Sequence, residues 1–242
     1  MSSANSINIG RLLPQLIYYF WSYSRIAQNP NEKVIYSVPS GNFGNLTGGL
    51  IASKMELPVD KFISAVNEND EFPKFLSTGI YQIIVPSRNC LSSAMNVGNP
   101  SNLARIFDLY GGQIDENGNI QRNPDLEKLR SIITSYSISD KLTKETIVGF
   151  YNKYEKIIEP HGAVGWAALQ IYRNKNPSQN DIKSITFETA DPAKFPDEII
   201  SLIKKKPKLP RTLEIIQNKK EYPNPIEINR YEDFKLFVQN KI

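Results

Sequence analysis

The amino-acid sequence predicts an α/β fold with a mostly parallel sheet flanked by helices. Two short runs, Val34–Val38 and Phe62–Val66, are apolar and β-branched without polar alternation, which is typical of strands covered on both faces. Helical patterns at 45–56 and 70–78 follow these two runs in turn. Alternation of strand and helix implies right-handed crossovers between parallel neighbours.

The remaining elements follow from the same patterns and from proline positions. Pro14 fits the first turn of an aromatic helix over 8–28, and Pro160 fits the start of another that reaches Arg173. The other expected elements, in chain order, are strand 33–38, strand 61–66, an irregular stretch 80–100, helix 102–109, a polar hairpin or loop 111–119, helices 124–136 and 142–155, strand 183–189 and helix 193–206.

The proline- and lysine-rich stretch 206–212 is typical of a linker. We therefore expect two domains, with residues 1–206 forming the main one. Residues 207–242 are expected to add the linker and a small extension containing a strand and a helix.

Composition excludes several classes of protein. The 242 residues are 40% hydrophobic and 22% charged, as in ordinary globular proteins, and the net charge of +4 is spread along the chain, so no nucleic-acid partner is expected. The apolar run 12–21 is too short and too interrupted for a membrane segment. The single cysteine, Cys90, fits a reducing, cytoplasmic location, and one histidine with one cysteine cannot build a structural zinc site, so no metal is expected.

The turn after the first strand is the candidate binding site. Gly41 and Gly44 allow backbone conformations in which successive N–H groups converge, and Asn45 is expected to cap the following helix. A helix N-terminus at such a turn favours phosphate, although a plain strand–helix turn explains the residues equally well. The single Gly-x-x-Gly lacks the three-glycine dinucleotide fingerprint. Because ligands gather beyond the carboxyl ends of parallel strands, segments 40–45 and 189–191 are expected to face the same ligand.

Five ordered motifs carry a family resemblance. They are Ser3-Ala4-Asn5-Ser6-Ile7-Asn8-Ile9-Gly10-Arg11, Ser40-Gly41-Asn42-Phe43-Gly44-Asn45, Leu91–Val97 followed by Asn99–Asn102, Glu159–Gly165, and Glu188–Phe195. Together they resemble the threonine synthase family of pyridoxal-phosphate (PLP) enzymes, which has fold type II, the tryptophan synthase β-like fold. The resemblance covers residues 2 to about 200.

The resemblance implies roles for particular residues. It assigns the PLP phosphate to the backbone of Gly41, Asn42, Phe43, Gly44 and Asn45, and the PLP ring nitrogen to the hydroxyl of Thr189. It assigns the substrate, O-phosphohomoserine, to Ser6, Asn8 and Arg11, with Asn96 and Asn102 expected near the same pocket. Asn96 and Asp191 depart from the family pattern, which usually has Asp and His at these two positions. The isolated His161 is interpreted as a structural residue at a helix start.

The family's Schiff-base lysine lies in a Phe-Lys-Asp segment upstream of these motifs, and this sequence contains no such segment. The resemblance therefore implies the C-terminal part of a threonine synthase, incomplete at the N-terminus and with no catalytic residue of its own. It implies conversion of O-phospho-L-homoserine and water to L-threonine and phosphate, the last step of threonine biosynthesis, with activity restored by a complementing N-terminal fragment.

Two further expectations concern the chain by itself. Apolar surface should be exposed on residues 12–21 and at the sheet edge, favouring self-association. The alternative function is a non-catalytic phosphate- or nucleotide-binding α/β module.

Overall fold

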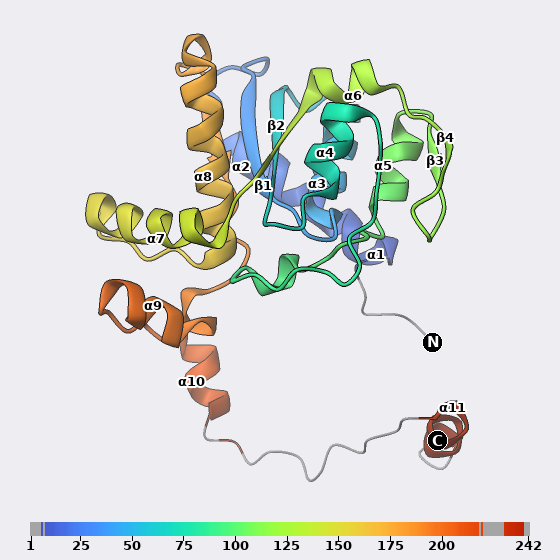
Figure 1. Ribbon diagram of the computed structural model, residues 1–242. Coiled ribbons are helices and arrows are strands. Elements are labelled where there is room, and N and C mark those ends of the chain that lie inside the picture. Colours follow the sequence, from blue (N-terminus) through green and yellow to red (C-terminus); the bar gives the residue numbers. More distant parts are fainter. Residues whose placement is uncertain (1–5, 7, 218, 220–229, 240–242) are drawn as a thin grey trace. The chain divides into compact units, whose positions relative to one another are not determined.

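The computed structural model describes residues 6, 8–217, 219 and 230–239, which fall into two units, 1–207 and 208–242 (Figure 1). The first unit contains the sheet and the helices around it. The described parts of the second unit contain the helices α10 (Arg211–Gln217) and α11 (Tyr231–Gln239). The expected C-terminal strand is therefore absent from the described residues of this unit.

The main sheet is parallel throughout, with strand order β5-β2-β1-β6. Its strands are β1 (Val34–Pro39), β2 (Val59–Val66), β5 (Ile133–Ser137) and β6 (Ser184–Thr186). β2 and β5 extend the sheet on one side of β1, whereas β6 pairs with the other side of β1. The sheet thus confirms the predicted parallel α/β class.

Helices cover both faces of the sheet, with α8 on one face and the group containing α3 and α4 on the other (Figure 1). The α-helices of this unit are α1 (Ile9–Leu12), α2 (Leu16–Ile26), α3 (Gly44–Lys54), α4 (Glu71–Thr78), α5 (Leu103–Leu109), α6 (Leu126–Ile132), α7 (Asp140–Tyr154), α8 (Pro160–Lys175) and α9 (Pro196–Ile203). Short 3₁₀ turns are η1 (Leu13–Gln15), η2 (Ser93–Met95), η3 (Pro177–Gln179) and η4 (Pro192–Lys194). A small antiparallel hairpin joins β3 (Gln113–Ile114) to β4 (Ile120–Arg122).

Alternate residues of β1 enter two different cores. Val34, Tyr36 and Val38 join the aromatic core beneath α2 and α3, whereas Ile35 packs against α8 on the opposite face. All six residues of β1 are buried, which explains why its sequence shows no polar alternation. At Gly165 of α8, an added Cβ would lie 2.9 Å from Thr186 Cγ2 and 3.0 Å from Pro39 Cγ, so this helix packs tightly over the ends of β1 and β6.

Several expected boundaries are wrong. The expected helix 124–136 ends at Ile132, and residues Ile133–Ser137 instead form the edge strand β5, whose residues after Ile133 are largely half-buried. The helix 8–28 is divided into α1, η1 and α2, because Pro14 removes a backbone donor within it. The expected strand 183–189 is limited to β6, because only Ser184–Thr186 pair with β1.

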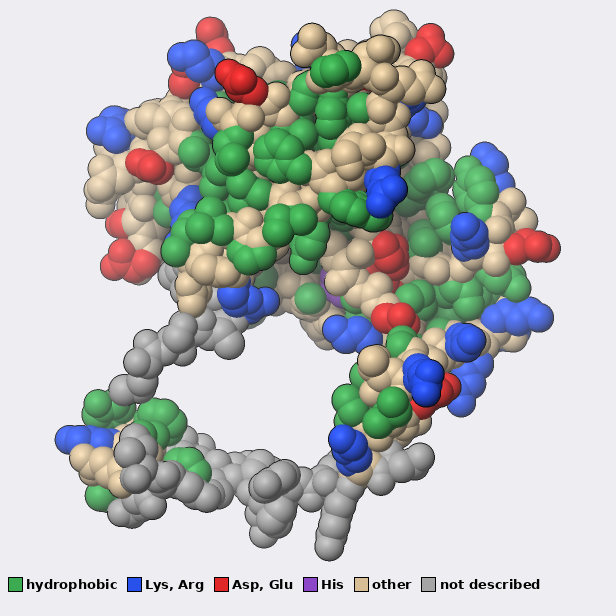
Figure 2. Space-filling view, turned by 180° about the vertical axis from the view of Figure 1, so that it is seen from behind, with side chains coloured by type: hydrophobic (Ala, Val, Ile, Leu, Met, Phe, Trp, Pro, Cys, Tyr) green, Lys and Arg blue, Asp and Glu red, His purple; other side chains and the backbone are tan. Residues whose placement is uncertain are grey.

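The outer face of the first two helices is apolar and exposed. Figure 2 shows hydrophobic side chains gathered on one side of the molecule. The exposed apolar residues of this region are Ile9, Leu13, Ile17, Tyr18, Phe20 and Trp21. Leu12, Leu16 and Tyr19 are buried, so the expectation of exposed surface on 12–21 holds for one face of the helix. Within the described residues, no helix is both long and apolar enough to cross a membrane.

Candidate functional site

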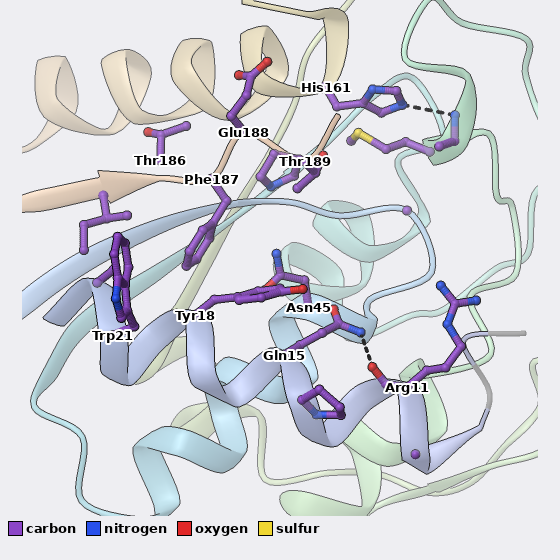
Figure 3. Close-up of a pocket in the computed structure, with 18 residues that line it drawn as sticks. Arg11, Gln15, Tyr18, Trp21, Asn45, His161, Thr186, Phe187, Glu188 and Thr189 are labelled. Atoms are coloured by element: carbon purple, nitrogen blue, oxygen red, sulfur yellow. Dashed lines mark hydrogen bonds between the residues drawn. The ribbon is translucent and has the colours of Figure 1, made fainter. Parts of the chain in front are cut away.

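A cavity of about 900 Å³ lies beyond the carboxyl ends of β1 and β6 (Figure 3). The chain leaves β1 toward β2 on one side, while β6 lies on the other side, so the loops after these strands diverge. Such a topological switch point is where open parallel sheets bind ligands. The walls are formed mainly by the turn after β1, the helices α1 and α2, and the segment 185–189, and Ala94 and Met95 of η2 and His161 of α8 complete them.

The turn after β1 places Gly41 and Asn45 on the cavity wall. Phe43 has φ 59°, in the left-handed region, and directly precedes α3 as its N-cap without a side-chain hydrogen bond. The expectation that Asn45 caps this helix is therefore wrong, since α3 begins one residue earlier, at Gly44. The first N–H groups of α3 have no side-chain acceptor at the cap, and the helix dipole adds to their preference for an anion.

Asn42 fixes the turn through its side chain. Its Oδ1 accepts hydrogen bonds from Ser101 N at 2.6 Å and Ser101 Oγ at 2.9 Å, and its Nδ2 donates to Ser6 Oγ. Asn102 Nδ2 donates to the backbone carbonyls of Asn42, at 2.9 Å, and of Ser6, at 3.2 Å. Ser6, Asn42 and Asn102 thus come together and support the turn, but none of them is among the residues that line the cavity, and their roles in ligand binding stay predictions.

The second wall is formed by α1 and α2. Asn8 caps α1, its Oδ1 accepting from Gly10 N at 2.9 Å, and this start aims the next turn of helix at the cavity. Arg11 lies on the wall, as do Gln15 and Tyr18 further along (Figure 3). Arg11 therefore lies on the cavity wall, whereas Asn8 caps α1, the helix that carries Arg11.

Tyr19 connects this wall to the turn. Its hydroxyl donates to Asn45, whose backbone oxygen lies at 3.0 Å and whose Oδ1 lies at 2.8 Å. The Tyr19 ring is fully buried against Tyr36 and Phe62. The first turn of α3 is thus attached to α2 as well as to the loop 101–102.

The third wall follows β6. Thr189 and Glu188 both line the cavity, as does Thr186, whose buried Oγ1 has no hydrogen-bond partner among the described residues (Figure 3). Burial raises the pKa of the Glu188 carboxyl to about 8, and the nearby carboxylates of Glu159 and Asp191 act in the same direction. Glu188 Oε1 accepts from Glu159 N at 2.9 Å, which partly opposes this rise.

His161 lines the cavity near this third wall. It lies in the first turn of α8, where the helix start was expected, and its Nε2 is 3.1 Å from the backbone N of Ala94. Glu159, the N-cap of α8, accepts from His161 N and Gly162 N through its two carboxylate oxygens. The interpretation of His161 as a helix-start residue that bonds exposed backbone agrees with this geometry.

Two residues that depart from the family pattern have local partners. Asn96 accepts from Asn67 Nδ2 at 2.9 Å and from Cys90 N at 3.2 Å, and it is not among the residues that line the cavity. Asp191 caps η4, accepting from Ala193 N at 2.8 Å. Cys90, whose backbone N donates to Asn96, is itself buried, and this burial raises the pKa of its thiol.

Several wall residues were not singled out from the sequence. On α1 and α2, the wall residues at 11, 14, 15, 18, 21 and 22 recur at helical spacing, a signal that the sequence did contain. Thr186 and Glu188 offered no such signal, because their position depends on where β6 ends. Among the described residues, no three His, Cys, Asp or Glu side chains are placed so that they could hold a metal ion together.

This arrangement suits a phosphate-bearing ligand. Backbone donors of the turn, a helix N-terminus and Arg11 favour negative charge at one end. Hydroxyl groups and the carboxyl of Glu188 lie at the other end, near the aromatic rings of Tyr18 and Phe187. The cavity can therefore hold a planar, phosphorylated molecule between polar ends.

Comparisons with family models, curated sequences and solved structures all find threonine synthases. The family model described as threonine synthase, C-terminal, matches residues 162–238. The threonine synthase of Buchnera aphidicola from Acyrthosiphon pisum is 35% identical over 249 residues, covering 100% of this chain and 51% of that protein. The chain thus spans about half the length of the curated relatives it matches.

Solved structures give the same result. A PLP-bound threonine synthase from Brucella melitensis superposes with a TM-score of 0.84 at 26% identity, over 99% of this chain and 52% of that one. The yeast threonine synthase superposes with a TM-score of 0.81 at 30% identity, over 98% and 53%. Because these matches run along the whole of the chain and agree with its fold type II architecture, the chain belongs to the threonine synthase family and corresponds to the C-terminal part of its members.

Proposed function

We propose that this chain supplies the C-terminal half of a threonine synthase, which converts O-phospho-L-homoserine and water to L-threonine and phosphate with PLP. The observation that carries this proposal is the convergence on one cavity of the turn at Gly41 and Asn45, of Arg11 and of Thr189. These residues come from three distant segments of the chain. The cavity volume of about 900 Å³ lies within the range of cofactor sites.

The residues present fit PLP at both of its polar ends. At one end, α3 begins without a side-chain cap, and the turn approaches the cavity at Gly41, where a Cβ would lie only 2.6 Å from Met95 Cα. At the other end, Thr186 Oγ1 lacks a partner among the described residues, and Thr189 lies beside it on the wall. A phosphate fits the first end, and a ring nitrogen fits the hydroxyl groups of the second.

In this proposal, different residues of the chain bind different parts of PLP and of the substrate. When bound, PLP supplies an electron sink for bond changes at the substrate carbons. The turn 41–45 would bind its phosphate through backbone N–H groups. Thr189 would orient its ring nitrogen, and because a hydroxyl carries no charge, it would not hold that nitrogen protonated as a carboxylate does. Arg11 would bind the phosphate of the substrate, with Asn8 and Ser6 positioning the segment that carries it.

A second polypeptide segment is needed for catalysis. The sequence has no Phe-Lys-Asp segment, and the relatives are about twice as long as the region they share with this chain. In this proposal, a polypeptide equivalent to the N-terminal half of those relatives supplies the lysine that holds PLP. It would cover the apolar outer face of α2 and the open edge of β6, and the single cysteine fits assembly in the cytosol.

Reconstitution tests the proposal. The chain is co-expressed with the half of the Buchnera threonine synthase that it does not cover, and threonine and phosphate are measured with O-phosphohomoserine and PLP. We expect product only from the pair. Gly41→Val in this chain should lower turnover at least ~100-fold, because the new side chain meets the backbone of Ala94 and Met95 and displaces the turn. The matched control Gly149→Val lies on α7, where an added Cβ meets nothing within 4 Å, and should retain activity.

Two results would contradict the proposal. Steady threonine formation by the chain alone would refute the need for an external lysine. A folded pair that forms no threonine, while the chain alone binds PLP or a nucleotide reversibly on dialysis, would favour the non-catalytic binding module.

A further inference from the structure

The single histidine of the chain uses both of its ring nitrogens. His161 is buried, and its Nδ1 lies 2.5 Å from Glu159 Oε2, while its Nε2 lies 3.1 Å from Ala94 N. A backbone N–H can only donate, so Nε2 must accept and carries no proton. The hydrogen-bond network therefore assigns a neutral ring with its proton on Nδ1.

Glu159 fixes this tautomer. It is fully buried at the N-terminus of α8, a helix of 16 residues, where the dipole favours a carboxylate. Its Oε2 accepts from His161 N at 2.8 Å as well as from the ring, and its Oε1 accepts from Gly162 N at 2.9 Å. Because the carboxylate only accepts, Nδ1 must donate to it.

The bond from Ala94 to His161 leads directly to the candidate phosphate turn. Ala94 and Met95 of η2 lie against Gly41, since an added Cβ on Gly41 would be 2.9 Å from Ala94 O and 2.6 Å from Met95 Cα. These are contacts with backbone, which side-chain rotation cannot relieve. Any movement of η2 therefore changes the wall that the turn rests on.

We propose that His161 is a positioning residue, which in its neutral form holds η2 against the turn at Gly41 and on protonation releases both segments. A protonated ring would point its Nε2–H at the Ala94 N–H, which places two donors face to face. The Ala94 N–H would then lose its acceptor, and η2 would keep only the packing of Met95 in the core that it shares with α8. In consequence, phosphate binding at the turn, which rests on the proposed function, should weaken as the ring gains a proton.

The groups around the ring define what else could titrate. Glu159 faces the ring from the start of α8. Glu188, on the segment after β6, accepts a hydrogen bond from Glu159 N, and Asp191 is near enough to raise the pKa of Glu188. The residues of η2 carry no charge, and the ring of Phe195 lies 5.4 Å from the imidazole, between centroids. Glu188 is therefore the competing titration that the test must separate from His161.

Nuclear magnetic resonance of the ¹⁵N-labelled chain tests the proposal without any ligand. Because the chain has one histidine, its imidazole signals are unambiguous. We expect the Nδ1–H tautomer at neutral pH, with scalar coupling between the Ala94 amide nitrogen and Nε2. On acidification, the amide signals of Ala94 and Gly41 should shift with the same midpoint as the imidazole.

Variants then connect the bond to binding, with PLP as the probe between about pH 5 and pH 8. His161→Gln offers an amide oxygen near the position of Nε2 but does not titrate, so its affinity should stay near that of the unmodified chain and lose the acid dependence due to His161. His161→Phe keeps a ring but no acceptor, and should bind about tenfold more weakly at every pH. Glu188→Gln keeps its acceptor oxygen for Glu159 N, so the acid midpoint should be unchanged.

Each outcome decides the matter. An Nε2–H tautomer, or Ala94 and Gly41 amides that ignore the imidazole titration, would overturn the inference. So would loss of the acid dependence in Glu188→Gln with its retention in His161→Gln. If the amides follow the imidazole but the unmodified chain binds no PLP at any pH, the positioning role stands and the PLP site of the proposed function fails.

Discussion

The inner and outer faces of α2 are both apolar, yet the structure covers only one of them. On the inner face, Tyr19 is fully buried and contacts the rings of Tyr36, Phe62 and Phe187. On the outer face, Ile17 remains 64% exposed. A helix that is apolar all round is normally buried all round, so the outer face of α2 is an unusually apolar exposed surface.

The contrast also bears on how the candidate site is built. The turn after β1 is held by Asn42, Asn102 and Tyr19, all through groups within the described chain. The α1–α2 wall contributes Arg11 from α1 and Tyr18 from α2, and Tyr18 is itself half-exposed. The turn after β1 is thus supported from within this chain, whereas the α1–α2 wall lies on helices with exposed apolar side chains.

The largest expected effect concerns the packed inner face. At Gly49 of α3, an added Cβ would lie 2.5 Å from Tyr19 Cζ and 2.7 Å from Phe62 Cε1, and both rings are fully buried. Gly49→Ala should therefore lower the free energy of unfolding by about 3 kcal/mol, measured by urea denaturation.

The control for this substitution is Gly149→Ala on α7, where an added Cβ meets nothing within 4 Å. Alanine favours a helix interior over glycine, so this variant should gain about 0.5–1 kcal/mol. Equal effects of the two substitutions would show that the inner face of α2 is not closely packed.

A second prediction concerns a carboxyl group on α4 that is buried away from water. Glu71, the first residue of α4, is 2% exposed, and its Oε2 has no partner among the described residues. Burial raises the pKa of Glu71 to about 7, and Asp70 adds to the rise, while Arg88 and Lys74 partly oppose it. Because the folded-state pKa exceeds the value of 4.5 for an unperturbed Glu, the folded state binds more protons, so stability should fall as pH rises from about 4.5 to 7.

Glu71→Gln removes this titration. It should remove the share of the pH dependence that Glu71 contributes in that window, leaving the share of Glu188, whose pKa is also raised, and the variant should exceed the unmodified chain by about 2 kcal/mol at pH 8. Thermal unfolding across pH measures the effect. Glu145→Gln, on the exposed surface of α7, is the control and should leave the profile unchanged. An unmodified chain whose stability rises between these pH values would contradict a buried Glu71 charge.

The sequence was sufficient for the central features of the fold. The uninterrupted apolar runs of β1 and β2 predicted parallel strands, and Gly41 predicted the turn, because both signals are local. β5 was missed, since Ile133–Ser137 follows α6 without a break and pairs with β2 only through long-range contacts. Its half-buried, polar edge position gave no apolar run to detect.

The candidate site was predictable to a similar extent. Gly41, Asn45, Arg11 and Thr189 line one cavity, whereas the wall does not include Ser6, Asn8, Asn42, Phe43 and Gly44, and the binding roles that the resemblance gives these residues stay predictions. Hydrogen bonds that cross the fold were not foreseeable, such as Ala94 N to His161 Nε2 over 67 positions. Such bonds depend on the packing of α8 against η2, and no local pattern encodes that packing.

The smallest expected change in stability concerns the exposed outer face. Ile17 and Ile80 are exposed to nearly the same extent, 64% and 63%, but only Ile17 belongs to the apolar face of α2. Lysine at either position should alter the free energy of unfolding by less than about 0.5 kcal/mol, because little apolar contact is lost. Sedimentation velocity should nevertheless separate them, with the unmodified chain and Ile80→Lys associating at high concentration and Ile17→Lys remaining monomeric. If the unmodified chain is monomeric at every concentration, this face does not drive self-association. If Ile17→Lys and Ile80→Lys bind the N-terminal half of a relative equally well, the outer face of α2 is not part of the proposed interface.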